Sequence, residues 1–210
     1  MLNKLDQIKS EFGIPLTGII HIGAHEGQEY EDYLSVGIQR IIFFEPIKSN
    51  FLKLLDRVKY SDIRVSCYNL ALGNKVGRIL MFVESENQGM SCSILEPAEH
   101  LIQYPWIKFT TKELVDINKL DNITIKRKLY NIINIDVQGY ELEVFKGAIR
   151  TLNTIDAIFT EVNMKEMYRG CALISDLDHF LGCRDFVRVT EQPPDSWGEA
   201  LYIKNKFVKD

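Results

Sequence analysis

Short apolar runs alternate along the chain with stretches in which apolar residues recur every three or four positions. The runs have the length of strands, and the stretches have the spacing of amphipathic helices. The pattern predicts strands over 18–23, 40–45, 64–72, 77–83, 130–137, 157–162, 186–190 and 199–204. It predicts helices over 1–13, 28–35, 49–58, 111–120, 141–152 and 175–181. Strands that alternate with helices in this way are typical of an α/β fold with a mostly parallel sheet.

Two regions depart from this alternation. The last two predicted strands are joined by a short proline-containing turn, which favours an antiparallel edge of the sheet. Residues 84–128 are more polar and less periodic, and we expect them to form an insert that faces the substrate. Within the insert, we expect the polar loop 84–93 to close over a bound substrate, with Gly89 as its flexible point and Ser91 and Ser93 as donors.

Composition limits the classes of protein that the chain can represent. Its 210 residues, 46% hydrophobic and 26% charged, suit a single globular domain over 1–210. A net charge of −4 argues against the phosphate backbone of a nucleic acid as the main partner. No apolar run approaches the ~20 residues of a membrane span, and the first 13 residues lack the apolar core of a secretion signal, so we expect a cytoplasmic protein. The four cysteines and four histidines lack zinc-ligand spacing, and we expect no metal.

A turn rich in small residues follows the first predicted strand, in the string Gly23-Ala-His-Glu-Gly27. Small residues at this point let the backbone approach a ligand at the carboxyl edge of a parallel sheet. His25 stands where a dinucleotide-binding turn has its second glycine, which disfavours a dinucleotide. Glu45 closes the second predicted strand about 20 residues after Gly23, the spacing expected of the acid that accepts ribose hydroxyls, and Pro46 helps to aim it. The pattern indicates a nucleotide-like ligand. The alternatives are an ordinary tight turn between strand and helix and a solvated glutamate at the end of a strand.

Several strings of the chain resemble those of a known family. The string Ile20-His-Ile-Gly-Ala-His-Glu-Gly27 resembles motif I of class I S-adenosylmethionine-dependent methyltransferases. More narrowly, the following strings resemble the FkbM family of these enzymes: Phe44-Glu-Pro46 with Asn50-Phe51, Asn69-Leu-Ala-Leu-Gly73, Ile135-Asp-Val-Gln-Gly-Tyr-Glu-Leu-Glu-Val-Phe-Lys-Gly147 and Thr160-Glu-Val-Asn163. The resemblance covers about 18–182, and 136–144 is its most specific part.

The resemblance implies a class I methyltransferase fold, which is Rossmann-like. This fold has a seven-stranded, mostly parallel sheet with an antiparallel edge strand and helices on both faces. The resemblance also implies S-adenosylmethionine as cofactor and O-methyl transfer to a hydroxyl of a small molecule or sugar (glycan).

The resemblance further implies where the cofactor binds, with its methionine end over Gly23, its ribose on Glu45 and its adenine at the end of the third strand. The candidate cofactor-binding residues are His21, Gly23, Ala24, Gly27, Glu45, Pro46, Asn69, Ala71, Leu72 and Asp136. His21 departs from the family, which usually has Asp there to help hold the methionine amino group. A neutral His21 can accept that contact, or it can be a buried packing residue. Asn69 can read the adenine edge, or it can serve the turn.

Three residues are candidates for the base that takes the acceptor proton. Asp136 ends a predicted strand at the ligand edge of the sheet, and it can accept or orient that proton. Its alternative roles are to cap the next helix or to hold the methionine end of the cofactor. Glu161 also ends a predicted strand, and His25 is a candidate because an imidazole exchanges protons near neutral pH. Asp136, Glu161 and Glu141 can also gather as oxygen ligands for Mg²⁺, although we expect a mechanism without metal.

Two other functions stay open at the level of sequence. A catalytically silent binding module would keep the fold as a scaffold, but the presence of Gly23, Glu45 and Asp136 favours an active enzyme. Methylation of nucleic acid is opposed by the net charge, although Lys126-Arg127-Lys128 forms a local basic run that is compatible with it.

Overall fold

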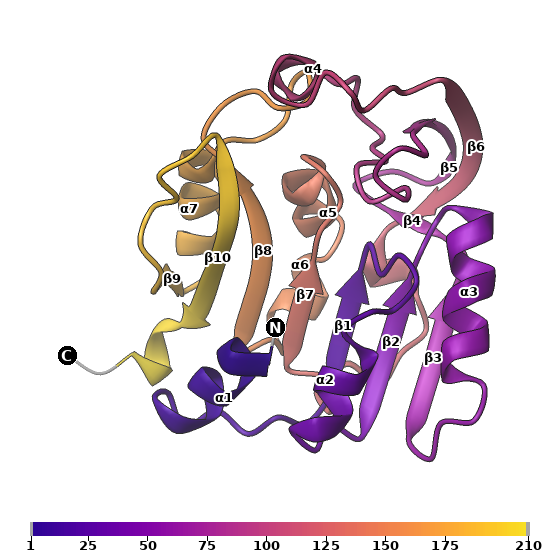
Figure 1. Cartoon of the computed structure of the whole chain (residues 1–210). Coiled ribbons are helices and arrows are strands. Elements are labelled where there is room, and N and C mark those ends of the chain that lie inside the picture. The colour runs from indigo at the N-terminus through magenta and orange to yellow at the C-terminus, as the bar shows by residue number, and fades with distance from the viewer. Residues whose placement is uncertain (1, 209–210) are drawn as a thin grey trace.

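The structure of the chain, a computed structural model, describes residues 2–208. Met1, which belongs to the predicted helix 1–13, lies outside the described residues. So do residues 209–210, the end of the predicted domain 1–210. The centre is a seven-stranded sheet in the order β3-β2-β1-β7-β8-β10-β9 (Figure 1). Its strands are β1 (Ile19–Ile22), β2 (Arg40–Phe44), β3 (Arg64–Tyr68), β7 (Ile132–Ile135), β8 (Ala157–Asn163), β9 (Phe186–Arg188) and β10 (Trp197–Lys204). All neighbours are parallel except β10, which runs antiparallel to β8 and β9, so the predicted mixed sheet is confirmed.

Helices cover both faces of this sheet (Figure 1). One face carries α1 (Leu2–Ser10), α2 (Tyr30–Ser35) and α3 (Lys48–Val58), and the other carries α5 (Glu141–Lys146), α6 (Ile149–Leu152) and α7 (Ile174–Gly182). Successive residues of a strand point to opposite faces, so Ile19 packs under the first set of helices and Ile20 under the second. All four residues of β1 are buried, as expected for a strand that is covered on both sides.

A second, smaller sheet lies beyond the carboxyl ends of the central strands (Figure 1). Its order is β4-β6-β5, with β4 (Ala71–Leu72), β5 (Gly77–Val83) and β6 (Thr111–Asn118). The chain also forms α4 (Glu99–Gln103) and three short 3₁₀ helices, η1 (Leu120–Asn122), η2 (Arg127–Leu129) and η3 (Asn205–Phe207). Within residues 2–208 no helix has the length and apolar character needed to cross a bilayer.

The structure corrects three predicted elements. The predicted strand 64–72 is two strands in two sheets, because the chain turns at Asn69 and Leu70 between β3 and β4. The predicted helix 111–120 is strand β6, which pairs with β5 over its first seven residues. The segment 84–128 is therefore more regular than expected, since it contains both α4 and β6.

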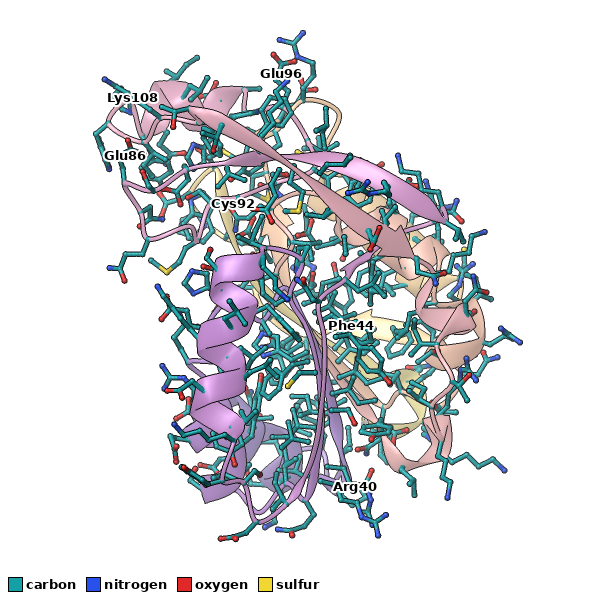
Figure 2. The ribbon with its side chains drawn as sticks, turned by 90° about the vertical axis from the view of Figure 1, so that its right-hand side faces the viewer. Arg40, Phe44, Glu86, Cys92, Glu96 and Lys108 are labelled. Carbon is teal, nitrogen blue, oxygen red and sulfur yellow. The ribbon has the colours of Figure 1, made fainter. Side chains whose placement is uncertain are left out.

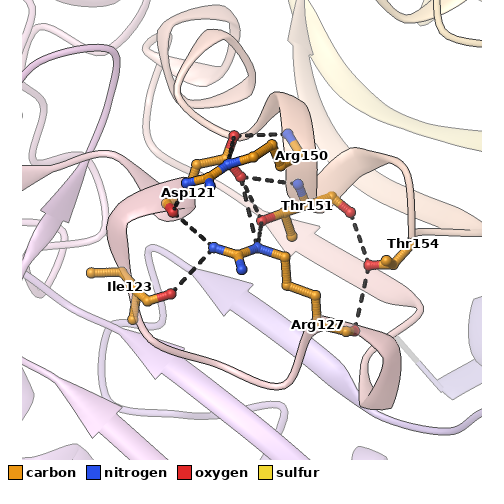
Figure 3. Close-up of polar contacts among 6 residues, drawn as sticks. All are labelled: Asp121, Ile123, Arg127, Arg150, Thr151 and Thr154. Atoms are coloured by element: carbon orange, nitrogen blue, oxygen red, sulfur yellow. Dashed lines mark hydrogen bonds and ion pairs between the residues drawn. The ribbon is translucent and has the colours of Figure 1, made fainter.

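The predicted helix 141–152 is divided into α5 and α6 at Gly147 and Ala148. A Cβ at Gly147 would lie 2.0 Å from the backbone oxygen of Gly73, so the chain needs glycine where these two segments cross. Asp121 fixes the start of α6: its Oδ2 accepts the N–H of Arg150 at 2.7 Å, and its Oδ1 accepts the N–H of Thr151 at 2.9 Å (Figure 3). A carboxylate at this position satisfies backbone donors that have no partner within the helix.

The basic run 126–128 does not form one exposed patch. The guanidinium of Arg127 points toward α6, where Nε donates to Thr151 Oγ1 at 3.0 Å and Nη2 to the backbone oxygens of Asp121 and Ile123 (Figure 3). Arg127 thus supports the turn between η1 and η2. This removes the central residue of the run from any nucleic-acid surface.

Candidate active site

A cavity of about 330 Å³ lies at the carboxyl ends of β1, β2 and β7, where the strand order reverses. Open α/β sheets bind ligands at this position, and the volume is within the ~300–1,000 Å³ of small-molecule sites. Most of the predicted site residues line it, namely His21, Gly23, Ala24, His25, Glu45, Pro46, Ala71, Leu72, Asp136 and Glu161. Figure 2 labels both ends of β2, Arg40 and Phe44, and shows Cys92 of the cavity wall beyond Phe44.

The loop after β1 passes very close to the end of β7. Gly23 has a φ of +78°, and a Cβ there would lie 1.8 Å from the backbone oxygen of Asp136. The N–H groups of Gly23 and Ala24 both donate to the backbone oxygen of Phe44 at 3.0 Å. Only glycine permits this close approach, which lets the loop form one wall of the cavity.

Glu45 holds the two loops on either side of it with its carboxylate. Oε2 accepts the N–H of His25 at 2.8 Å, and Oε1 accepts the N–H of Ile47 at 2.8 Å. Burial raises the pKa of Glu45 to about 8, although the two N–H groups oppose that rise. Each oxygen keeps a further lone pair, so the carboxylate can accept hydroxyl groups of a ligand in the cavity.

Two predicted cofactor residues, Gly27 and Asn69, are not among the residues that line the cavity. Gly27 has a φ of +73° and packs on α3, where a Cβ would come within 2.6 Å of Leu54 Cδ1. The amide of Asn69 donates to the backbone oxygens of Glu45 at 2.9 Å and Pro46 at 2.8 Å. Both residues therefore support the loops that form the cavity, and for Asn69 this contact favours the turn role over adenine recognition.

His21 is buried beside Tyr33 and Asn134. The amide of Asn134 donates to His21 Nε2 at 3.2 Å, and the hydroxyl of Tyr33 lies 3.1 Å from Nδ1. Burial lowers the pKa of His21, which agrees with a neutral ring that accepts at Nε2. Glu29 reaches within 4.0 Å of Nδ1 and lines the same cavity. Sequence analysis did not identify Glu29. Its carboxylate lies beside His21, the position at which the resemblance described above implies an aspartate.

His25 uses both ring nitrogens within the protein. Nε2 lies 2.7 Å from the backbone oxygen of Gln88, and the amide of Gln28 lies 2.7 Å from Nδ1. A neutral ring satisfies both contacts if Nε2 donates and Nδ1 accepts. With both nitrogens occupied, His25 is suited to join the loop after β1 to the loop 84–93.

Three carboxyl groups meet between β7, α5 and β8. Oxygens of Asp136, Glu141 and Glu161 lie within 4.8 Å of one another. Burial is the main cause that raises the pKa of all three, of Glu141 to about 7 and of Glu161 well above its ordinary value. The negative charges of Asp136 and Glu141 also raise the pKa of Glu161, so the cluster keeps a proton that separated carboxyl groups would release. Such a cluster can exchange protons, and its oxygens can also bind a hard cation such as Mg²⁺.

Gln138 positions this cluster, and sequence analysis did not identify it. Its Nε2 donates to Asp136 at 2.8 Å and to Glu161 at 2.7 Å, while its Oε1 accepts the hydroxyl of Tyr168 at 2.6 Å. The backbone of Gln138 has a φ of +53°, a conformation that costs energy in a residue with a side chain. Gln138 lies within 136–144, the most specific part of the resemblance, and this position is the feature of the sequence that could have identified it.

A second cavity, of about 370 Å³, adjoins the first. Both cavities are lined by Met90, Asp136, Gln138, Glu161 and Trp197. The remaining walls come from the insert and from the loop after β8, and consist of Asn87, Ser91, His100, Tyr104, Trp106, Ile107, Met167 and Tyr168. Figure 2 shows other residues of the insert, Glu86, Glu96 and Lys108, at the end of the molecule opposite Arg40.

The loop 84–93 folds around a buried carboxylate. Glu84 accepts the N–H of Asn87 at 2.7 Å and that of Ser91 at 3.1 Å. The hydroxyl of Ser93 donates to the backbone oxygen of Gln138 at 2.7 Å and is fully buried. The expected donation from Ser93 to a ligand is therefore wrong, because its proton is already used, whereas Ser91 lines the second cavity.

Two sequence comparisons relate the chain to known proteins. A family model described as the methyltransferase FkbM domain matches residues 21–188. The chain is 30% identical over 173 residues to the 2-O-methyltransferase NoeI of Sinorhizobium fredii, a match that covers 78% of this chain and 70% of that protein.

Solved structures share the fold at low sequence identity. Magnesium protoporphyrin IX methyltransferase (ChlM) from Synechocystis PCC 6803, with bound S-adenosylmethionine, matches with a TM-score of 0.52 and 9% identity over 97% of this chain and 79% of that chain. Ribosomal protein L11 methylase from Lactobacillus delbrueckii subsp. bulgaricus matches with a TM-score of 0.54 and 9% identity over 97% of this chain and 76% of that chain. At this level of identity the two structures support the fold.

Proposed function

The chain belongs to the FkbM methyltransferase family, and from this premise we propose that it methylates a hydroxyl of a small-molecule or sugar acceptor. It is an S-adenosylmethionine-dependent methyltransferase. One observation carries the choice of a hydroxyl: Asp136 and Glu161 lie on the wall shared by the two cavities, where a carboxylate can take a proton. The name of the related 2-O-methyltransferase agrees with oxygen as the methylated atom.

The lining of the first cavity fits the cofactor by its chemistry. Glu45 offers two oxygens, held by backbone N–H groups, to the ribose hydroxyls. Glu29, beside the neutral His21, offers a carboxylate to the methionine ammonium group. The loop at Gly23 leaves room for the methionine chain, and the apolar residues around Leu72 form a surface for the adenine.

Bound S-adenosylmethionine supplies a methyl group whose bond to sulfur breaks, leaving its electron pair on sulfur, as the acceptor oxygen forms the new C–O bond. A general base must accept the proton that the hydroxyl loses in this step. Of the two carboxyl groups on the shared wall, that of Asp136 is exposed and that of Glu161 is buried, so Asp136 is the base in this proposal. Its raised pKa brings the carboxylate closer to the pH at which it works, which favours proton transfer. Gln138 holds both carboxyl groups in position.

The test is methyl transfer from radiolabelled S-adenosylmethionine to a panel of neutral glycosides, alcohols and phenols, with the products analysed by mass spectrometry. We expect a methyl ether from at least one hydroxyl compound. Binding of S-adenosylmethionine without any transfer would support the silent module instead. Transfer to RNA or DNA in the same assay, with none to the panel, would support nucleic-acid methylation.

A second measurement addresses the acidic cluster, whose oxygens lie within 4.8 Å of one another. In the proposed mechanism the cluster works with protons alone, so EDTA leaves turnover unchanged. Loss of activity in EDTA and its return with Mg²⁺ would assign a divalent cation to Asp136, Glu141 and Glu161.

A further inference from the structure

The second cavity differs from the first in its lining, because aromatic residues dominate it. Tyr104, Trp106, Tyr168 and Trp197 all contribute to its walls, together with the imidazole of His100. Trp106 is 62% exposed and Trp197 is 39% exposed, so both line the cavity with apolar surface that the protein leaves uncovered. Exposed apolar surface with a polar rim is typical of a binding site.

Contacts within the wall fix the orientation of these rings. The indole N–H of Trp197 donates to the hydroxyl of Tyr104 at 2.8 Å. The ring of Tyr104 lies edge-on to Trp106, with centroids 5.5 Å apart and planes at 83°. The platform is therefore built before a ligand binds, which lowers the entropy lost on binding.

The polar part of the lining carries negative charge or none. Among the described residues that form this cavity, the carboxylic acids are Asp136 and Glu161, and no lysine or arginine is present. Burial lowers the pKa of His100, the remaining basic group of the lining, which favours its neutral form. Asn87, Ser91 and Gln138 add neutral hydrogen-bonding groups. An anion placed here would face like charge and would find no cation to offset its loss of hydration.

We propose that the second cavity binds the acceptor as an uncharged, polyhydroxylated ring that stacks on Trp106, and that it rejects anionic acceptors. A sugar ring presents a face of C–H groups to an aromatic platform and a rim of hydroxyls to carboxylates and amides. One of these hydroxyls then points to Asp136, at the wall shared with the cofactor cavity. This inference rests on the proposed function and adds to it the site and the charge of the acceptor.

Intrinsic fluorescence tests the inference directly, because the chain has only two tryptophans and both line this cavity. Trp197 also lines the first cavity, so the variant W197F leaves Trp106 as the single reporter of the second. The unaltered protein and W197F, each saturated with S-adenosylhomocysteine, are titrated with methyl glycosides of the common hexoses and deoxyhexoses. Glucuronate, glucose 6-phosphate and glucosamine serve as charged comparisons.

We expect a saturable change in emission with at least one neutral glycoside and at least tenfold weaker binding of both anionic sugars. Equal or tighter binding of an anionic sugar, or tenfold tighter binding of glucosamine, would overturn the inference. So would the absence of any saturable change with neutral glycosides in a protein that still binds S-adenosylhomocysteine by calorimetry. Failure to bind S-adenosylhomocysteine at all would instead count against the proposed function.

A matched pair of variants separates stacking from general damage to the insert. Trp106→Ala removes a lining ring, whereas Ile102→Ala removes a 74% exposed side chain of α4 that does not line the cavity. We expect Trp106→Ala to weaken glycoside binding, read from Trp197, at least tenfold and to leave the affinity for S-adenosylhomocysteine within twofold. Ile102→Ala should change neither. An equal effect of the two variants on glycoside binding would contradict the platform.

Discussion

Trp197 at the start of β10 donates its indole N–H to the hydroxyl of Tyr104, 93 positions earlier in the chain. This bond joins the central sheet to the insert in the wall of the second cavity. Tyr104→Phe removes the acceptor and keeps the ring, so we expect the KM for the acceptor to rise about 3- to 10-fold, from the ~1 kcal/mol of one hydrogen bond. The Kd of S-adenosylmethionine should not change. Tyr60→Phe, at an 86% exposed site on the surface, is the control, and an equal shift in both constants would contradict the interpretation.

Glu29 is expected to hold the ammonium group of the cofactor. Glu29→Gln keeps the shape of the side chain and removes its charge, so the Kd of S-adenosylmethionine should rise by about 10-fold, corresponding to the ~1.5 kcal/mol of a charged hydrogen bond. Calorimetry measures the change. The neighbouring acid Glu31, on the first turn of α2, provides the matched control Glu31→Gln. The assignment fails if the two variants bind the cofactor equally well.

Glu45 is expected to accept the ribose hydroxyls. Burial raises the pKa of Glu45 to about 8, so the binding measurement is made at pH 9, where the carboxylate is charged. Glu45→Ala should then weaken binding of S-adenosylmethionine by about 1.5–3 kcal/mol, the range of hydrogen bonds to a charged group. Glu45→Gln should be milder, because the amide keeps one acceptor oxygen. Since Glu45 also holds the N–H groups of His25 and Ile47, circular dichroism must first show that each variant is folded. Unchanged affinity in a folded Glu45→Ala protein would rule out this ribose contact.

Asp136 is expected to act on the acceptor proton. Asp136→Asn cannot accept a proton, so kcat should fall ~10²–10⁴-fold, the usual contribution of general base catalysis, while the Kd of the cofactor changes little. A rise in that Kd with a smaller loss of kcat would mean that Asp136 mainly holds the methionine end. If neither constant changes, the base is Glu161 or His25. Single-turnover kinetics together with calorimetry distinguish these outcomes.

Glu141 should make stability depend on pH. Burial raises its pKa from an ordinary 4.5 to about 7, so between these pH values the folded state keeps a proton that the unfolded state releases. The stabilisation is complete below pH 4.5 and is lost as the pH rises through 7, at about 1 kcal/mol per pH unit for this group. Glu141→Gln has no such proton, and its amide oxygen can still accept the N–H groups of Val137 and Gly139. Urea unfolding at pH 5, 6 and 7 should therefore give a shallower pH dependence for the variant, and equal slopes would contradict the prediction.

The central sheet could be predicted because buried parallel strands are nearly continuous apolar runs, as in Ile132–Ile135. The small sheet could not. In β6, Leu114 and Ile117 stand three positions apart and imitate a helix, whereas the alternation of buried Val115 and Ile117 is the true pattern. β6 is a strand because it pairs with β5, some 30 residues earlier. The pattern of residues within β6 does not reveal that pairing.

The same distinction applies to the site. Gly23, Glu45 and Asp136 could be predicted because the carboxyl ends of parallel strands meet at one edge of the sheet. Gln138 and Trp197 could not, since one depends on an unusual backbone conformation and the other on the direction of its strand. Glu29 could not be predicted either, since it stands at the start of α2 and approaches His21 only because of the path of the loop after β1.

Because β10 runs in the reverse direction, one wall of the ligand site is formed by a different kind of segment from the others. Within the described sheet, β10 alone brings its first residue, Trp197, to the edge where the other strands end. The loops at Gly23 and Glu45 follow strands, whereas Trp197, on the wall that the two cavities share, depends on the turn 189–196 that precedes its strand. Changes in that turn can shift Trp197 while the loops at Gly23 and Glu45 stay in place. The fold can therefore acquire new acceptors during evolution without having to rebuild its methyl-donor site.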